Sequence, residues 1–279
     1  MTDRNSIGVF DSGYGGLTIL KEIVRVLPEY DYIYLGDNAR TPYGTRSFEV
    51  VYRYTLEAVR KLFGMGCPLV ILACNTASAK ALRTIQQVDL PRMEATRRVL
   101  GVIRPSVEAL ASFTRNGHVG ILATKGTVAS ESYPLEIEKL YGKEAFRITQ
   151  VACPMWVPLV ENNELADEGA VYFVRKYIAE LMTADPQIDT VILGCTHYPL
   201  LRSRIIEYFG EKVHIVNPAY ETAMDLKSIL EKKGIANQSG KPAVYDFYVS
   251  DAAEKFTQFA NTILPYDVAA TKQINIEEY

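Results

Sequence analysis

The sequence predicts an α/β protein made of two related units, each with a mostly parallel sheet. Short apolar runs alternate with longer segments in which apolar residues recur every three or four positions, a pattern typical of parallel strands joined by helices. Two stretches are rough copies of each other: VILACNTASAKALR begins at Val70 and VILGCTHYPLLR begins at Val191. Their cysteines, Cys74 and Cys195, lie 121 residues apart. We therefore expect two pseudo-symmetric α/β domains with a site in the cleft between them.

The first domain is expected to cover residues 1–99 together with 215–279. Its short apolar runs predict strands, and the longer periodic segments predict helices with one buried face. The expected strands are 6–10, 32–35 and 69–73. The expected helices are 15–27, 48–65 and one that begins at 76. The segment 87–106 is charged, contains two prolines and is expected to cross to the second domain.

The second domain is expected to cover residues 100–214. Here the same alternation gives strands at 118–123, 147–152, 190–194 and 213–216. It gives helices at 130–141, 168–182, a segment that ends at 208, and 224–233. The tail from residue 235 is loop-rich and then strand-like, so we expect it to rejoin the first domain, which is then discontinuous. A weaker repeat supports the pairing of the domains, since IGVFDSG from Ile7 resembles VGILATK from Val119.

Composition excludes several classes of protein. The net charge is -3 and no basic stripe is present, so a nucleic-acid partner is not expected. The longest clean apolar run, PLVILAC at 68–74, is too short to span a bilayer. No signal peptide fits ahead of the first strand, so we expect a cytoplasmic protein.

The four cysteines are Cys67, Cys74, Cys153 and Cys195, and none forms a C-x-x-C pair. With only three histidines, the sequence gives no metal site. In a reducing cytoplasm we expect free thiols. We assign a structural role to Cys67 and Cys153.

Cys74 and Cys195 each follow a strand and precede an expected helix. Ligands of parallel sheets bind beyond the carboxyl ends of the strands, so both thiols are candidates for a site. A helix N-terminus favours the thiolate over the thiol. Inverting a stereocentre requires removal of a proton from one face of a carbon and delivery to the other, and two acid/base groups on opposite sides achieve this.

Two turns could hold a small amino acid between such thiols. DSGYGG, from Asp11, is a Gly-rich turn whose N–H groups and Ser12 hydroxyl could bind a carboxylate. TPYGTRS, from Thr41, offers further donors at Tyr43 and Gly44. The remaining candidates for this cradle are Asn75, Thr76, Thr127 and Thr196.

Each signal has a plainer explanation when taken alone. A cysteine after a buried strand can be a small core residue. DSGYGG can be a tight turn or a phosphate loop, although it lacks the spacing of P-loop and dinucleotide motifs. Asp11 can cap a helix, and His197 can be a structural histidine.

Taken together, the motifs GVFDSGYGGLTIL, YLGDNARTPYGTRS, LACNTASA and LGCTHYPLL, in this order, closely resemble glutamate racemase, a family of cofactor-independent amino-acid racemases. The resemblance runs from Gly8 to about Leu201. It implies interconversion of L- and D-glutamate, which supplies D-glutamate for bacterial peptidoglycan. It also implies two α/β domains around the active site, a homodimer, and neither pyridoxal phosphate nor a metal.

The resemblance also assigns roles to residues. The family's catalytic cysteines fall on Cys74, which would act on D-glutamate, and on Cys195, which would act on L-glutamate. Asp11 would assist Cys74, and His197 would assist Cys195. Glu161, in VPLVENNE, matches an acidic residue that supports catalysis. The substrate contacts fall on Asp11, Ser12, Tyr43, Gly44, Asn75, Thr76, Thr196 and His197.

Two features depart from the family pattern. PRMEATRRVLGVIRPS, from Pro91, is longer than the usual link, and Asn217 stands where an aspartate is common. Neither of these features lies within the two cysteine motifs. The remaining alternatives are a racemase of aspartate or another acidic amino acid, and a non-catalytic amino-acid-binding protein. NTAS and CTHYPL favour glutamate.

Overall fold

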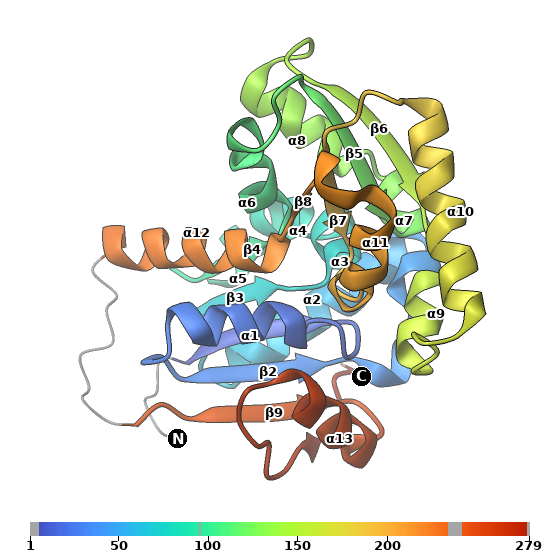
Figure 1. The fold of residues 1–279 in the computed structure, drawn as a ribbon. Coiled ribbons are helices and arrows are strands. Elements are labelled where there is room, and N and C mark those ends of the chain that lie inside the picture. Colours follow the sequence, from blue (N-terminus) through green and yellow to red (C-terminus); the bar gives the residue numbers. More distant parts are fainter. Residues whose placement is uncertain (1–5, 95, 234–241, 278–279) are drawn as a thin grey trace.

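In the computed structural model, which describes residues 6–94, 96–233 and 242–277, the chain forms two parallel sheets flanked by helices (Figure 1). This confirms the predicted fold class. Every strand predicted from the sequence is present, with ends that shift by at most one residue. The first sheet contains β1 (Ile7–Asp11), β2 (Tyr32–Gly36), β3 (Leu69–Leu72), β4 (Arg98–Gly101), β9 (Tyr245–Val249) and β10 (Lys272–Gln273). The second contains β5 (His118–Ala123), β6 (Arg147–Ala152), β7 (Thr190–Gly194) and β8 (His214–Val216).

The second sheet repeats the order of four strands of the first, β2-β1-β3-β4, which supports the predicted pseudo-symmetry. The first runs β10-β9-β2-β1-β3-β4 and the second runs β6-β5-β7-β8. β1 and β5 therefore occupy equivalent central positions, as do β3 and β7, the strands that lead to Cys74 and Cys195. All the pairings between these strands are parallel. β1, β3 and β7 are buried along their whole length, because helices cover both faces of each sheet.

The helices and helical turns lie on both sides of these sheets. Those after the first sheet's strands are α1 (Leu17–Val26), η1 (Asn38–Arg40), η2 (Tyr43–Thr45), α2 (Phe48–Gly64), α3 (Asn75–Lys80), α4 (Leu82–Thr84), η3 (Ile85–Asp89) and α5 (Leu90–Met93). The second group is α6 (Ile103–Glu108), η4 (Leu110–Ser112), α7 (Lys125–Ala129), α8 (Ser132–Tyr141), α9 (Trp156–Glu161), α10 (Glu168–Ala184), η5 (Tyr198–Leu201), α11 (Arg202–Phe209) and η6 (Gly210–Lys212). α12 (Pro218–Lys233) and α13 (Ala253–Ile263) follow β8 and β9.

α12 carries the chain back to the first sheet. Its buried face, with Leu226 and Leu230, belongs to the same hydrophobic cluster as Leu20 and Ile23 of α1, and the two helices lie side by side in Figure 1. The helix begins six residues earlier than the predicted 224–233, because Asn217 Oδ1 accepts a hydrogen bond from the backbone N–H of Ala219 at 3.2 Å and so caps its first turn.

The tail after α12 rejoins the first sheet, since β9 pairs with β2 along five residues. The loop-rich stretch predicted from residue 235 lies partly outside the described residues, as do the first five residues of the chain. The limits 1–99 with 215–279, and 100–214, stay a prediction.

The segment 87–106 is more structured than expected. We predicted a link there, whereas Arg98–Gly101 forms β4 and pairs with β3. The helix expected from residue 76 is broken into α3 and α4, followed by a π-helical turn at Ile85–Asp89 and then α5. The chain therefore adds β4 to the edge of the first sheet before it crosses to the second.

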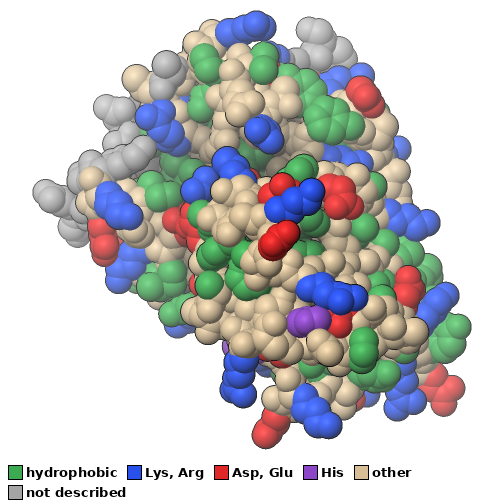
Figure 2. All heavy atoms as spheres, turned by 90° about the horizontal axis from the view of Figure 1, so that it is seen from above, with side chains coloured by type: hydrophobic (Ala, Val, Ile, Leu, Met, Phe, Trp, Pro, Cys, Tyr) green, Lys and Arg blue, Asp and Glu red, His purple; other side chains and the backbone are tan. Residues whose placement is uncertain are grey.

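On the face shown in Figure 2, lysine and arginine side chains are interspersed with acidic ones. No helix among residues 6–94, 96–233 and 242–277 is long and apolar enough to cross a bilayer.

Candidate active site

A cleft between the two sheets brings most of the predicted site residues together. Its lining includes Ser12, Tyr43, Gly44, Asn75, Thr76, Thr196, His197, Glu161 and both candidate cysteines. Asp11 and Thr127 do not line it; both are fully buried behind the wall. All four cysteines of the chain are free and buried, as expected.

Cys74 lies just beyond β3 and is the N-cap of α3. Its sulfur accepts from the backbone N–H of Ala77 at 3.5 Å and donates to the Ser12 hydroxyl at 3.4 Å. Ser12 comes from the turn after β1, the neighbouring strand. The thiol is therefore held between the ends of two adjacent parallel strands, with only 5% of the residue exposed.

The electrostatics at Cys74 favour the thiol over the thiolate. Burial and the nearby negative charge of Asp11 raise the pKa of Cys74 to about 12, against the opposing effect of hydrogen bonding with Ser12 and Ala77. We expected the helix N-terminus to favour the thiolate. The Ala77 N–H does so, but desolvation outweighs it. Cys74 is accordingly a proton donor at neutral pH.

Cys195 stands at the equivalent position after β7 and has a different neighbour. Its sulfur lies 3.8 Å from Nδ1 of His197, and Nε2 of that ring lies 3.1 Å from Oε1 of Glu161. The three groups form a chain from thiol to imidazole to carboxylate. A histidine oriented by a carboxylate is a common arrangement for activating a nucleophile or base.

His197 is cationic at neutral pH. Burial lowers the pKa of the imidazole, but hydrogen bonds to Cys195 and Glu161, and the charges of both groups, raise it to about 10. The two thiols thus have opposite neighbours, an anion for Cys74 and a cation for Cys195.

Asp11 links the two halves of the site from behind. Its carboxylate accepts from the backbone N–H of Gly13 at 2.9 Å, and the Thr196 hydroxyl donates to it at 3.5 Å. Burial raises the pKa of Asp11, while the charge of His197 lowers it. Asp11 therefore acts on Cys74 through its charge, and it fixes the turn that carries Ser12.

The turn after Asp11 packs tightly on the second sheet. A Cβ atom on Gly15 would lie 2.3 Å from the Thr196 hydroxyl and 2.5 Å from Nδ1 of His197. The Thr18 hydroxyl also donates to the backbone carbonyl of Thr196 at 3.0 Å. Only glycine fits at this close approach.

Tyr43, which the sequence offered as a source of donors, turns its side chain away from the cleft. Its hydroxyl does not face the cleft but donates to Oδ2 of Asp37 at 2.5 Å, and the residue is 1% exposed. The donors that Tyr43 and Gly44 can offer in the cleft are therefore backbone N–H groups.

Amide and hydroxyl side chains line the part of the cleft where α3 faces α7. The Asn75 amide donates to Tyr133 at 3.0 Å, and within the described part of the chain nothing pairs with its carbonyl oxygen. The hydroxyl of Thr76 lies 3.0 Å from that of Thr124 and 3.4 Å from that of Thr127. These hydroxyls hold the first sheet's helix α3 against the second sheet's helix α7.

Sequence reasoning missed several residues of the lining. They are Thr41, Pro42, Thr45, Thr124, Lys125, Cys153, Pro154, Val157 and Pro158. The sequence did contain a signal for Thr124, because it occupies the position in the repeat VGILATK that Ser12 occupies in IGVFDSG. Cys153, to which we assigned a structural role, is buried and also lines the cleft.

Comparison with known proteins agrees with this geometry. The sequence pattern of the family described as Asp/Glu/Hydantoin racemase matches residues 7–225. The chain belongs to this racemase family. It is therefore an isomerase that acts as an amino-acid racemase.

Relatives of the racemase cover nearly its whole length. It is 41% identical over 273 residues to the glutamate racemase of Geobacter metallireducens, covering 98% of this chain and 97% of the relative. It is 39% identical over 275 residues to the glutamate racemase of Oceanobacillus iheyensis, covering 97% of each.

Solved structures show the same fold. The glutamate racemase isoform RacE1 of Bacillus anthracis superposes with a TM-score of 0.89 at 35% identity, covering 98% of both chains. The glutamate racemase of Francisella tularensis, solved in complex with D-glutamate, gives 0.88 at 30% identity, covering 99% of this chain and 100% of that one.

Replacing Glu161 by glutamine is expected to shift the alkaline limb of the racemase's pH profile downward by about one unit. Glutamine keeps an oxygen for the imidazole but removes the charge that helps to raise the pKa of His197 to about 10. The imidazolium is then lost at lower pH, and the donor to Cys195 is lost with it. The measurement is kcat/KM against pH for both enantiomers.

The matched control for this change is Glu164→Gln, an exposed carboxylate three residues further along the chain. It is expected to leave the profile where it is. An alkaline limb that stays in place in the Glu161 variant would show that the carboxylate does not act through His197.

Proposed function

We propose that the chain is a glutamate racemase that interconverts L- and D-glutamate by proton transfer between the α-carbon and two thiols. The observation that carries this proposal is the placement of two buried thiols, Cys74 and Cys195, at the ends of equivalent strands and on one cleft. The similarity to glutamate racemases and the D-glutamate bound in a structural neighbour support the choice of glutamate.

In the L-to-D direction, the thiolate of Cys195 removes the α-proton of L-glutamate. The S–H bond forms as the C–H bond breaks, and the electron pair remains on the α-carbon. The Cys74 thiol then delivers its proton to the opposite face and becomes the thiolate. The reverse reaction starts from that state, with Cys74 acting on D-glutamate.

The charge states described above support this assignment. Cys74 is a thiol at neutral pH because its pKa is raised to about 12 by burial and Asp11. His197, with a pKa of about 10, offers a proton to the sulfur of Cys195. The cation beside Cys195 and the protonated thiol of Cys74 support Cys195 as the base and Cys74 as the acid in the L-to-D direction.

Neutral groups complete the substrate site in this proposal. The N–H groups of Tyr43 and Gly44 and the hydroxyls of Ser12, Thr76 and Thr196 bind carboxylate oxygens. The unpartnered oxygen of Asn75 accepts from the α-ammonium group. Because these donors carry no full charge, they bind an anion without altering which thiol is ionised.

The finer parts of the proposal come from the family resemblance. D-Glutamate serves peptidoglycan synthesis, and the protein works in the cytoplasm as a homodimer without an organic cofactor or a metal.

The test is turnover of each enantiomer, followed by circular dichroism with no cofactor added and with a chelator present. We expect L- and D-glutamate to reach the same racemic mixture, with aspartate turned over far more slowly. If aspartate were turned over and glutamate were not, the assignment of glutamate as the substrate would be wrong. If glutamate were bound without any loss of optical activity, the protein would be a binding protein and not a racemase of glutamate.

A further inference from the structure

Asp37 lies directly after β2, behind the turn that carries Tyr43, and its carboxylate is completely buried. Oδ2 accepts from the Tyr43 hydroxyl at 2.5 Å and from Nε of Arg40 at 2.7 Å. Oδ1 accepts from the Ser250 hydroxyl at 2.9 Å. Three segments of the chain therefore meet on one carboxylate that does not itself line the cleft.

The charge of Asp37 is compensated within the protein. Arg40 pairs with both Asp37 and Glu57, and its guanidinium lies 4.0 Å from the centre of the Tyr54 ring. A buried carboxylate that is paired and hydrogen-bonded in this way keeps one geometry, because the loss of a single partner leaves a buried charge that is no longer fully compensated.

The ring of Tyr43 transmits this geometry to the cleft. It packs between Phe10 and Tyr54, with ring centres 6.2 and 5.8 Å away. Its hydroxyl is directed at Asp37, so the backbone of η2 is presented on the other side, where Tyr43, Gly44 and Thr45 line the cleft. The side chain serves as the anchor of this turn.

The opposite side of the turn is fixed by the second sheet. A Cβ atom on Gly44 would lie 2.9 Å from Cβ of Thr124. The turn is thus held between Asp37 of the first sheet and Thr124 of the second. Any movement of the Tyr43 hydroxyl away from Asp37 changes the distance between the backbone N–H groups and a bound carboxylate.

The tail of the chain also contacts this carboxylate. Ser250 follows β9, and its hydroxyl accepts from the backbone N–H of Ala39 at 2.8 Å while donating to Asp37. The tail therefore packs against the back of the substrate-binding turn.

We propose that Asp37 is a positioning residue for substrate binding: it holds the Tyr43 phenol so that the backbone of the 43–45 turn is set at the correct distance from the substrate carboxylate. This inference rests on the proposed function, since it takes glutamate as the ligand. Asp37 acts through Tyr43 and touches no reacting atom.

The test is a double-mutant cycle with Tyr43→Phe and Asp37→Asn. Tyr43→Phe keeps the ring and removes only the hydroxyl. We expect KM for glutamate to rise about tenfold in each single variant, with kcat changing less than threefold, because a misplaced turn weakens binding in the ground state and the transition state alike. The KM of the double variant is expected to be no higher than that of the more impaired single variant, since both changes break the same Tyr43–Asp37 hydrogen bond.

A binding readout separates this inference from the proposed function. The Cys74→Ser/Cys195→Ser variant is titrated with D-glutamate by calorimetry, with and without Tyr43→Phe. We expect weaker binding in the presence of Tyr43→Phe. Equal affinities would overturn the positioning role and leave the function intact. Glutamate that is neither bound nor turned over by the unaltered protein would overturn the function itself.

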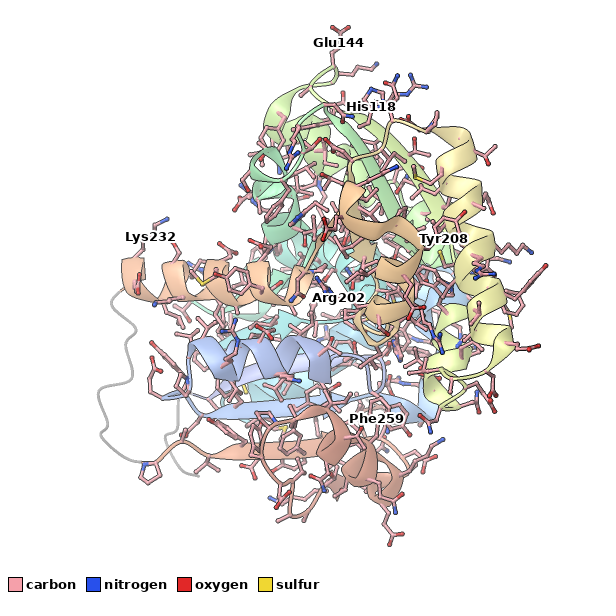
Figure 3. The ribbon with its side chains drawn as sticks, in the orientation of Figure 1. His118, Glu144, Arg202, Tyr208, Lys232 and Phe259 are labelled. Atoms are coloured by element: carbon pink, nitrogen blue, oxygen red, sulfur yellow. The ribbon has the colours of Figure 1, made fainter. Side chains whose placement is uncertain are left out.

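The matched control is Asp185→Asn. Asp185 is also buried, and it accepts hydrogen bonds from His118 at 2.8 Å and from the Gln187 N–H at 3.0 Å. His118 lies at the end of the second sheet that faces away from the first (Figure 3). We expect a lower melting temperature and an unchanged KM. If Asp37→Asn and Tyr43→Phe behave in the same way as this control, Asp37 has only a structural role.

Discussion

Serine in place of either Cys74 or Cys195 is expected to lower racemisation of glutamate on the order of a thousandfold, in both directions. A hydroxyl is far too weak an acid to supply a base at neutral pH, and each direction needs one base and one acid. The sulfur atoms sit in small buried sites, so serine fits without strain. The measurement is the change in optical rotation from each enantiomer, with binding of glutamate measured in parallel.

Isotope exchange distinguishes the two thiols. In deuterated water the unaltered enzyme is expected to place label first in the product enantiomer, since the thiol that delivers the proton is not the one that removed it. In Cys74→Ser, the remaining thiol can still exchange the α-proton of L-glutamate without inverting it. Normal racemisation by the double variant, or equal early labelling of substrate and product in the unaltered enzyme, would contradict the two-thiol assignment.

Gly15→Ala is expected to reduce kcat by about a hundredfold, a loss that a misplacement of about 1 Å at a catalytic group can cause. The added methyl would overlap the Thr196 hydroxyl at 2.3 Å and Nδ1 of His197 at 2.5 Å. Neither atom is the end of a long flexible chain, and both residues are buried. The imidazole must therefore move away from Cys195 or from Glu161. Steady-state kinetics and a thermal melt measure the outcome.

Gly169→Ala is the matched control. Gly169 lies in the first turn of α10, and a Cβ there meets nothing within 4 Å. Alanine is expected to leave activity unchanged and to raise the free energy of unfolding by about 0.5–1 kcal/mol. An unchanged kcat in Gly15→Ala would mean that the turn after Asp11 can move away from the second sheet without affecting catalysis.

Much of the fold could be predicted from the sequence because central parallel strands are buried on both faces. β3 and β7 carry continuous apolar runs, and a cysteine follows within two residues of the end of each strand, a local signal that needs no knowledge of distant contacts. β4 was missed because it is exposed at its first residue and only partly buried at its last two, as suits an edge strand. Its pairing with β3 is a tertiary contact.

The candidate site could be predicted as a set of residues but not as a geometry. Motif order placed Cys74, Cys195 and His197 correctly at strand ends. It could not show that the Tyr43 hydroxyl is bound to Asp37, since that contact depends on where an aromatic ring fits in the core. It also could not predict the raised pKa of Cys74, because burial outweighs the local effect of the helix N-terminus.

The shared strand order makes the two halves alike in shape, yet an aspartate adjoins one sulfur and an imidazolium adjoins the other. Enantiomers have identical free energies in water, so at equilibrium neither can be favoured, whatever the enzyme's charges. Any faster turnover of one mirror image must therefore be matched by a proportionally weaker apparent affinity for it.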